Sequence, residues 1–162
     1  MLFKPICEIK MRYQGETVWI APYGEKEKSG YGSGSGTVSG KVLNGTINWS
    51  NHPRRREDGV WCPDINGFIT TDDGARILAA IMGYSILEKP PGVKRSIVAA
   101  VWFQVASDDE RYRWLNYVIG IGEGEIDEET EEFWMRVSAC LNEVSSNPSA
   151  ILGAQEAAER LT

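Results

Sequence analysis

Two polar residues in the middle of the chain, Asp64 and Asn66, have the types and spacing that acid–base chemistry requires. They lie two positions apart in the β-rich stretch 60–71, so their side chains share one face of a strand with Phe68. A carboxylate enclosed by protein is suited to proton transfer because burial disfavours its charged form. We therefore take Asp64 as the candidate proton-transfer group, and Asn66 as the amide that would orient a carbonyl or hydroxyl of a bound molecule.

The opposite face of the same strand carries Ile65 and Ile69, which leaves two orientations open. If the isoleucines face the interior, Asp64 is a solvated surface carboxylate. If the polar face looks inward, the fold encloses a lumen with an anchored carboxylate and amide, as in small barrels that hold one ligand. The strand pattern alone does not distinguish the two.

The only histidine, His52, is a further catalytic candidate because it lies in a loop where a barrel mouth would be. A lone loop histidine is more commonly a solvated side chain. The basic run from Arg54 to Arg56 that follows is either a solvated loop or a capture site for an anionic group. One histidine and scattered carboxylates lack metal-ligand spacing, and no cofactor motif is present, so we predict neither a metal nor a cofactor.

Six tryptophans are many for 162 residues. Such rings commonly fill a core. Gathered around a polar pair, they would instead line a site for an aromatic or polycyclic ligand. The candidates for that site are Trp49, Trp61, Trp102 and Trp114, with Trp49 and Trp102 foremost, together with Phe68 on the strand face of Asp64 and Asn66.

An all-β pattern positions these residues. Its clearest signal is the Asp72-Asp73-Gly74 turn, where glycine supplies the positive φ of a tight hairpin and the carboxylates are interpreted as turn-capping groups. The glycine-rich residues 29–36 are flexible by composition and predict a rim loop or a bent strand. They lack the following helix and the Lys-Ser/Thr pair of a phosphate loop. A short helical turn is expected over residues 107–115.

Eight to ten short strands punctuated by turns predict a closed antiparallel barrel or a sandwich. After the strands, Asn147-Pro148 is typical of a helix start, and the alanine-rich residues that follow are amphipathic. The expected organisation is a β-barrel domain over residues 1–145 and a helical extension over 146–162. That helix would pack on the barrel, close one end, or meet a second subunit.

The composition is that of a globular protein, with 42% hydrophobic residues and a formal net charge of -6. An acidic surface argues against binding to nucleic acid or to anionic membranes. Three widely spaced cysteines predict no disulfide framework, and the N-terminus lacks the apolar run of a signal peptide. We expect a cytoplasmic protein.

Several motifs fall in the same order as in a known family. They are Gly40-x-Val42-Leu43-x-Gly45, Trp49, Asp58-Gly59-Val60, Asp64, Thr71-Asp72-Asp73-Gly74-Ala75-x-Ile77, Trp102-Phe103, Arg111-Tyr112-x-Trp114-Leu115-Asn116 and Gly120-x-Gly122. Over residues 3–140 the chain resembles the family catalogued as domain of unknown function number 3237. The resemblance implies a lipocalin-like antiparallel β-barrel, and the matching aspartate at Asp64 favours the inward orientation of the polar face.

The chain departs from that family where the site is expected. The family's arginine and tyrosine before the Asp-Asp-Gly turn are replaced by Asn66 and Gly67, and Asn48 replaces an aspartate. The predicted function is binding of a small aromatic or polycyclic metabolite, with cofactor-independent acid–base catalysis (isomerase, cyclase, hydratase or lyase) as its enzymatic form. The alternatives are a non-catalytic carrier or sensor of a hydrophobic metabolite, and a homo-oligomeric assembly protein.

Overall fold

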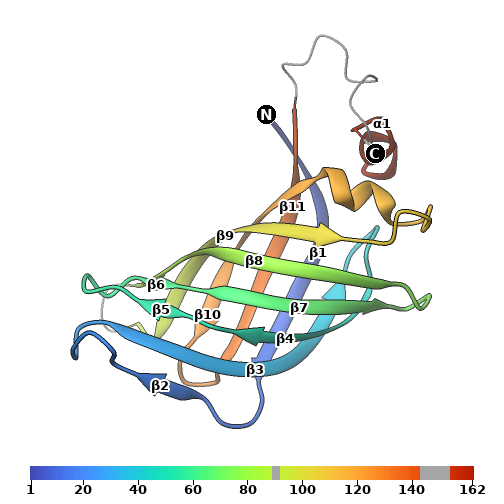
Figure 1. Cartoon of the computed structure of the whole chain (residues 1–162). Coiled ribbons are helices and arrows are strands. Elements are labelled where there is room, and N and C mark those ends of the chain that lie inside the picture. The colour runs from blue at the N-terminus through green and yellow to red at the C-terminus, as the bar shows by residue number, and fades with distance from the viewer. Residues whose placement is uncertain (89–91, 143–153) are drawn as a thin grey trace.

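The chain folds as a closed antiparallel barrel of eight strands (Figure 1). The computed structural model describes residues 1–88, 92–142 and 154–162. Neighbouring strands pair in the order β1-β11-β10-β9-β8-β7-β4-β3, and β3 pairs back to β1. The barrel strands are β1 (Leu2–Tyr13), β3 (Lys28–Ser39), β4 (Gly45–Asn51), β7 (Asp64–Thr71), β8 (Arg76–Leu87), β9 (Lys94–Gln104), β10 (Ile119–Asp127) and β11 (Glu132–Leu141). The predicted closed barrel is confirmed.

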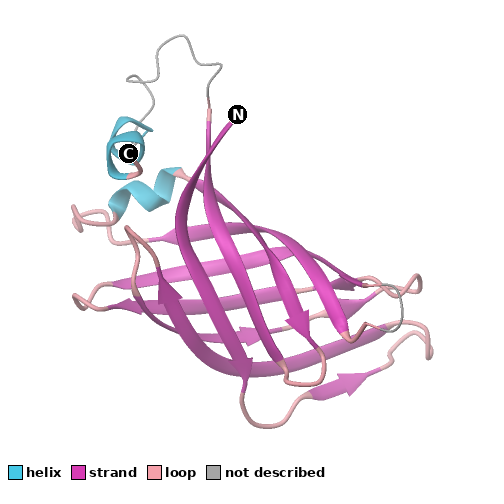
Figure 2. Cartoon of the chain, turned by 180° about the vertical axis from the view of Figure 1, so that it is seen from behind, coloured by secondary structure: helices cyan, strands magenta, loops and turns pink. Residues whose placement is uncertain are grey.

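Smaller elements distinguish the two ends of the barrel (Figures 1 and 2). The short strands β2 (Val18–Ile20), β5 (Arg54–Arg55) and β6 (Trp61–Cys62) lie at one end. The 3-10 helix η1 (Arg113–Tyr117) and the helix α1 (Ala154–Arg160) lie together at the other. The helical turn expected over 107–115 is therefore displaced toward the C-terminus. The expected helix start at Asn147-Pro148 lies outside the described residues.

The barrel interior is a packed apolar core, because each strand alternates buried apolar residues with outward-facing ones. In β1, for example, Ile9 and Met11 are buried while Lys10 is exposed. At the η1 end, Trp114 and Leu115 are fully buried and plug the barrel. No helix in the described part of the chain has the length and apolar character needed to cross a membrane.

Strand β7 faces the opposite way to the orientation that the family match favoured. Ile65 and Ile69 are buried in the core, whereas Asn66 is exposed and Asp64 and Phe68 are half-buried on the outer face. The inward orientation of the polar face is wrong. The interior is filled with apolar side chains, so the two isoleucines are buried there at no cost. An inward-facing Asp64 would instead have buried a carboxylate without a compensating partner.

The glycine-rich residues 29–36 form a regular part of β3, so of the two expected forms the strand is the one present, and the rim loop is not. Gly32 and Gly34 point into the barrel, where aromatic rings cover them. An added Cβ would lie 2.6 Å from the Tyr13 ring at Gly32, and 2.7 Å from the Trp49 ring at Gly34. The glycines thus provide the space in which aromatic side chains of neighbouring strands pack.

The Asp72-Asp73-Gly74 turn joins β7 to β8 as predicted, with Gly74 at φ +86°. Asp73 acts as a capping group, because its carboxylate accepts hydrogen bonds from the Thr71 hydroxyl at 2.5 Å and the Tyr112 hydroxyl at 3.1 Å. It also pairs with Arg111 at 3.1 Å. This contact network ties the β7–β8 turn to the segment that leads into η1.

Candidate functional site

The barrel opens at the end opposite η1 into a pocket of about 230 Å³, which we call the mouth pocket. The ends of four barrel strands supply Tyr13, Asn51, Ser85 and Arg95, and β6 supplies Trp61. The loop after β10 adds Glu128 and Glu131, and β2 adds Trp19. Aromatic rings and a few convergent polar groups are typical of a small-molecule site.

The polar residues Ser85 and Arg95 of the mouth pocket occupy inward-facing positions in strands whose other inward-facing side chains are apolar. In β9 the buried Arg95 precedes the buried Ile97, and in β8 the buried Ser85 comes four residues after the buried Ile81, so both polar residues lie on the mouth side of the apolar ones. Trp61 pairs directly with Ser85 across β6 and β8. The inward face therefore changes from apolar to polar as the strands reach the mouth.

In the part of the chain that the structure describes, Arg95 is the one basic residue that lines the mouth pocket, and its side chain is only 11% exposed. Its Nε donates to the carboxylate of Glu128. Its guanidinium also lies over the Trp61 ring, 5.5 Å from the centroid. These two contacts compensate for the burial of the charge.

Three polar atoms on residues that line the pocket are buried without a hydrogen-bond partner in the described structure: Arg95 Nη1, Ser85 Oγ and Trp61 Nε1. Trp49 Nε1, one layer deeper in the core, is in the same condition. Buried polar groups in folded proteins are nearly always satisfied, and each one left alone destabilises by about 1–3 kcal/mol. Such a concentration at one opening indicates a place where an acceptor atom from outside the chain is bound.

The Tyr13 hydroxyl accepts a hydrogen bond but donates none within the part of the chain that the structure describes. The Asn51 side chain accepts a hydrogen bond from the backbone N–H of Asp64 at 3.0 Å, which fixes the orientation of its amide. The Asn51 amide then donates to the Tyr13 hydroxyl at 2.7 Å. Because that oxygen acts as an acceptor, its own proton is available to a bound molecule. Burial raises the pKa of Tyr13 above its ordinary value, so it is protonated at neutral pH.

The charge balance of the mouth pocket is acidic. Among the described residues that line it, Asp127, Glu128 and Glu131 are acidic and Arg95 is basic, and Arg55 lies nearby, 6.0 Å from the centroid of the Trp61 ring. Backbone N–H groups of Thr130 and Glu129 donate to Asp127 and hold its pKa below the usual range. Glu131 has a left-handed backbone, with φ 57°. A ligand with a negative charge would be repelled here.

Strand β2 borders the opening and pairs only with β3. All three of its residues are exposed. Trp19 contacts the Trp61 ring edge-on, with centroids 4.8 Å apart. Few contacts hold this strand, and local opening free energies are low for such elements.

Most of the residues predicted for the site lie elsewhere. Asp64 and Asn66 hydrogen-bond to each other at 2.9 Å on the outer face. His52 and Asp64 line a shared hollow outside the barrel, and Arg54 and Arg56 border the same hollow. Asp64 does act at the mouth, but through its backbone N–H to Asn51.

The predicted aromatic residues lie in four different places. Trp61 lines the mouth pocket, and Trp49 is a core residue in edge contact with Tyr13 at 4.7 Å. Trp114 is buried at the opposite end. Trp102 and Phe68 lie on the outer face of the barrel.

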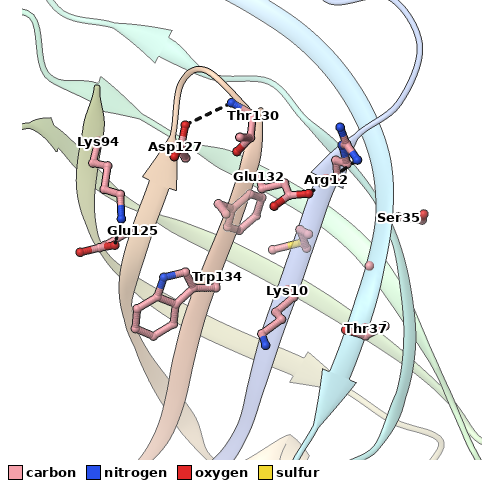
Figure 3. A pocket seen from close by; sticks show the side chains of 13 residues that line it. Lys10, Arg12, Ser35, Thr37, Lys94, Glu125, Asp127, Thr130, Glu132 and Trp134 are labelled. Carbon is pink, nitrogen blue, oxygen red and sulfur yellow. Dashed lines mark hydrogen bonds and ion pairs between the residues drawn. The ribbon is translucent and has the colours of Figure 1, made fainter. Parts of the chain in front are cut away.

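A second hollow, of about 510 Å³, lies on the outside of the barrel over β1, β3, β10 and β11 (Figure 3). Its charged groups are paired with one another, as in Lys94–Glu125 at 3.2 Å and Arg12–Glu132 at 3.6 Å. These solvent-exposed pairs leave no buried atom in need of a partner. The mouth pocket is therefore the better candidate, although it is smaller.

Solved structures share this barrel. A β-barrel-like protein from Acinetobacter baumannii superposes with a TM-score of 0.74 at 18% identity, covering 85% of this chain and 94% of that one. A protein of unknown function from Clostridium acetobutylicum also gives 0.74 at 18% identity, covering 86% and 96%. An enzyme from Penicillium herquei gives 0.57 at 22% identity, covering 83% and 95%.

No protein-family model matches the chain, and a search of curated proteins finds no match. Sequence identities this low support a shared fold only, so any function must be argued from the residues of the site. The chain has the same β-barrel fold as these proteins.

Proposed function

We propose that the protein binds a small, uncharged aromatic molecule with an oxygen acceptor, such as a carbonyl group, in the mouth pocket. The observation that carries this proposal is the set of unpartnered buried atoms, Arg95 Nη1, Ser85 Oγ and Trp61 Nε1. A carbonyl oxygen is the kind of acceptor that donors of this type require, and Trp19 and Trp61 line the pocket with aromatic surface for the ring.

The volume and charge of the pocket narrow the ligand class. An enclosed space of about 150 Å³ holds a single benzene ring, so about 230 Å³ suits one or two rings. This is smaller than most drug-sized sites. The excess of carboxylates favours a neutral molecule over a carboxylate or phosphate.

A binding experiment with matched probes tests the proposal. Intrinsic tryptophan fluorescence, which reports on Trp19 and Trp61, is followed during titration with 4-hydroxyacetophenone, 2-naphthol and 4-hydroxybenzoate. The two neutral probes are expected to bind, and the carboxylate to bind at least about tenfold more weakly because like charges repel. Equal binding of all three probes, or no binding of the neutral ones, would contradict the proposal.

Variants locate the binding site. Ser85→Ala removes one donor and is expected to weaken binding of the neutral probe by about 5–15-fold, the value of one hydrogen bond in a desolvated site. Ser96→Ala, on the outer face of the next strand, is the matched control and leaves the affinity unchanged. An unchanged Kd in Ser85→Ala would exclude the Ser85 hydroxyl as a donor to the ligand oxygen.

A second function, acid catalysis by Tyr13, is favoured by its free hydroxyl proton. Tyr13 would donate that proton to the bound oxygen as negative charge develops there, and Glu131 lies close enough to raise the Tyr13 pKa. One protein with the same fold, from Penicillium herquei, is an enzyme, but at 22% identity it supports the fold alone. Tyr13→Phe would retain binding of the neutral probes and abolish any conversion detected by mass spectrometry. Equal conversion by Tyr13→Phe excludes this role.

We also propose that the chain belongs to the family catalogued as domain of unknown function number 3237. Two of the sequence motifs that suggest it are far apart in the chain but adjacent in the fold. Asp73 of the turn motif contacts Arg111 and Tyr112 of the later motif. Motifs that form one contact network are expected to be retained together.

A further inference from the structure

The outer surface of the barrel is strongly asymmetric. Six of the large hydrophobic side chains that are exposed along β8, β9 and β10 point outward with exposed fractions from 38% to 59%. We call this surface the β8–β10 face; it comprises Leu78, Met82, Tyr84, Val98, Trp102 and Ile119. The outer side of β1 and β11 instead carries charged residues such as Lys10, Arg12 and Glu132.

Strand register makes the β8–β10 face continuous. Ala80 pairs with Trp102, which pairs with Ile119, and Tyr84 pairs with Val98. The row between them places Met82 beside the small residue Ala100. Charged side chains border these rows: Glu123 pairs with Val98 on the β10 side, Asp64 pairs with Met82 on the β7 side, and the Arg56 guanidinium lies 5.9 Å from the centroid of the Tyr84 ring.

We propose that the β8–β10 face binds the same face of a second copy of this chain, giving a symmetric dimer. The area supports this occupant. Half-exposed side chains of this size present on the order of 550 Å² together, at the upper end for a monomer and most of the roughly 800 Å² per partner of a standard interface. The alanines and the rim supply the remainder.

The charges also favour a second copy over other occupants. An isologous interface brings each surface against itself, so the apolar centre on β8 and β9 meets the same apolar centre of the copy. The bordering charges of Glu123, Asp64 and Arg56 then fall at the polar rim of the interface. A lipid bilayer would need an apolar band around the whole barrel, and the charged side chains of β1 and β11 interrupt such a band. Two sheet faces pack well at about 10 Å separation.

Sedimentation velocity over a range of protein concentrations tests the dimer. The wild-type protein is expected to sediment at twice the 18.0 kDa mass of one chain, with a Kd on the order of 1 µM. Val98→Glu places a charge in the centre of the face and is expected to raise the Kd at least about 100-fold. Thr37→Glu, an exposed outer-face residue on β3, is the matched control and leaves the Kd unchanged.

A second variant guards against a folding defect. Met82→Lys introduces the opposite charge at another exposed position of the face and should dissociate the dimer equally, with an unchanged far-ultraviolet circular dichroism spectrum. A wild-type monomer at all concentrations, co-flotation with neutral or anionic phospholipid vesicles, or a dimer that persists in both variants would each overturn the proposal.

Discussion

Ser85 illustrates the conflict between stability and binding at a single residue. Its hydroxyl is buried in the mouth pocket without a hydrogen-bond partner among the described residues. In the unliganded protein the hydroxyl has therefore lost its hydration without gaining a hydrogen bond, which destabilises the fold. Removing it leaves an apolar surface that does not need a hydrogen bond. The residue is therefore expected to be unfavourable for folding and favourable for binding.

This conflict gives a prediction for unfolding. Ser85→Ala is expected to increase the free energy of unfolding of the unliganded protein by about 1 kcal/mol, because a buried unsatisfied hydroxyl is removed. Denaturation in urea measures it, with Ser96→Ala as the control that leaves the midpoint unchanged. A loss of stability in Ser85→Ala would show that the hydroxyl has a partner in the folded protein.

Cys7 gives a second prediction at this scale. Burial in the core raises the pKa of its thiol from 9.0 to about 12, so almost no reactive thiolate is present at pH 8. Cys62 and Cys140 are half-buried. In a thiol-reagent assay at pH 8, Cys7 is expected to react only after unfolding, and Cys7→Ala to leave the fast phase unchanged. Fast modification of Cys7 in the native protein would contradict its burial.

The sign of the Cys7 contribution to stability follows from the same shift. Well below pH 9 the thiol is protonated in both the folded and the unfolded chain, so stability does not vary with pH through this group. As the pH rises from 9 toward 12, the unfolded chain releases its proton first, so the unfolded state is favoured and the free energy of unfolding falls.

At the scale of elements, the β7–β8 turn is stabilised by one buried hydroxyl. Thr71 Oγ1 accepts from the backbone N–H of Ala75 at 2.8 Å and donates to Asp73 at 2.5 Å. That second bond is the main cause of the lowered pKa of Asp73. The turn and the segment before η1 therefore depend on the same side chain.

Thr71→Val is expected to lower the free energy of unfolding by about 1–3 kcal/mol, because a buried N–H loses its acceptor. Thr71→Ser, which keeps the hydroxyl, should recover most of the loss. The Asp73 contribution is present above its ordinary pKa of 3.8 and is lost as the pH falls below that value, so the effect of Thr71→Val should shrink in acid. Thermal unfolding at pH 7 and pH 3 measures both; equal effects at the two values would argue against the Thr71–Asp73 bond.

The elements also show which features the sequence could predict. Strand alternation is local, so the barrel and the Asp-Asp-Gly turn were predictable. The orientation of β7 was not, because Phe68 on one face and Ile65 on the other are both apolar, and only the packed interior selects between them. The inward position of the glycines in β3 was not predictable either, because they make room for rings that come from other strands, such as Trp49.

The mouth pocket was missed for a related reason. Its residues come from the ends of several strands, and no short motif joins them. One signal was present in the sequence: Arg95 and Ser85 continue the phase of buried apolar residues in their strands. A polar residue at an inward position near a strand end is a better indicator of a barrel site than a polar pair on the outer face of a strand, such as Asp64 and Asn66.

For the whole molecule, the net charge of -6 opposes association of two copies. Repulsion between the copies is long-ranged at about 10 mM salt, where the Debye length is roughly 30 Å, and is mostly screened at 0.15 M. The dimer Kd is therefore expected to fall by several-fold between these conditions. Sedimentation at the two ionic strengths measures the change; a Kd that rises with salt would indicate an interface held by ion pairs and not by the β8–β10 face.

The plug formed by Trp114 and Leu115 has a kinetic consequence. A molecule bound at the mouth has no exit through the η1 end, so it must leave by the route through which it entered. We expect the rate of release to depend on the opening that Trp19 of β2 borders, and not on transit along the barrel axis. Substrate and product of any turnover would pass through this one opening in turn, so a product would have to leave before the next substrate could enter.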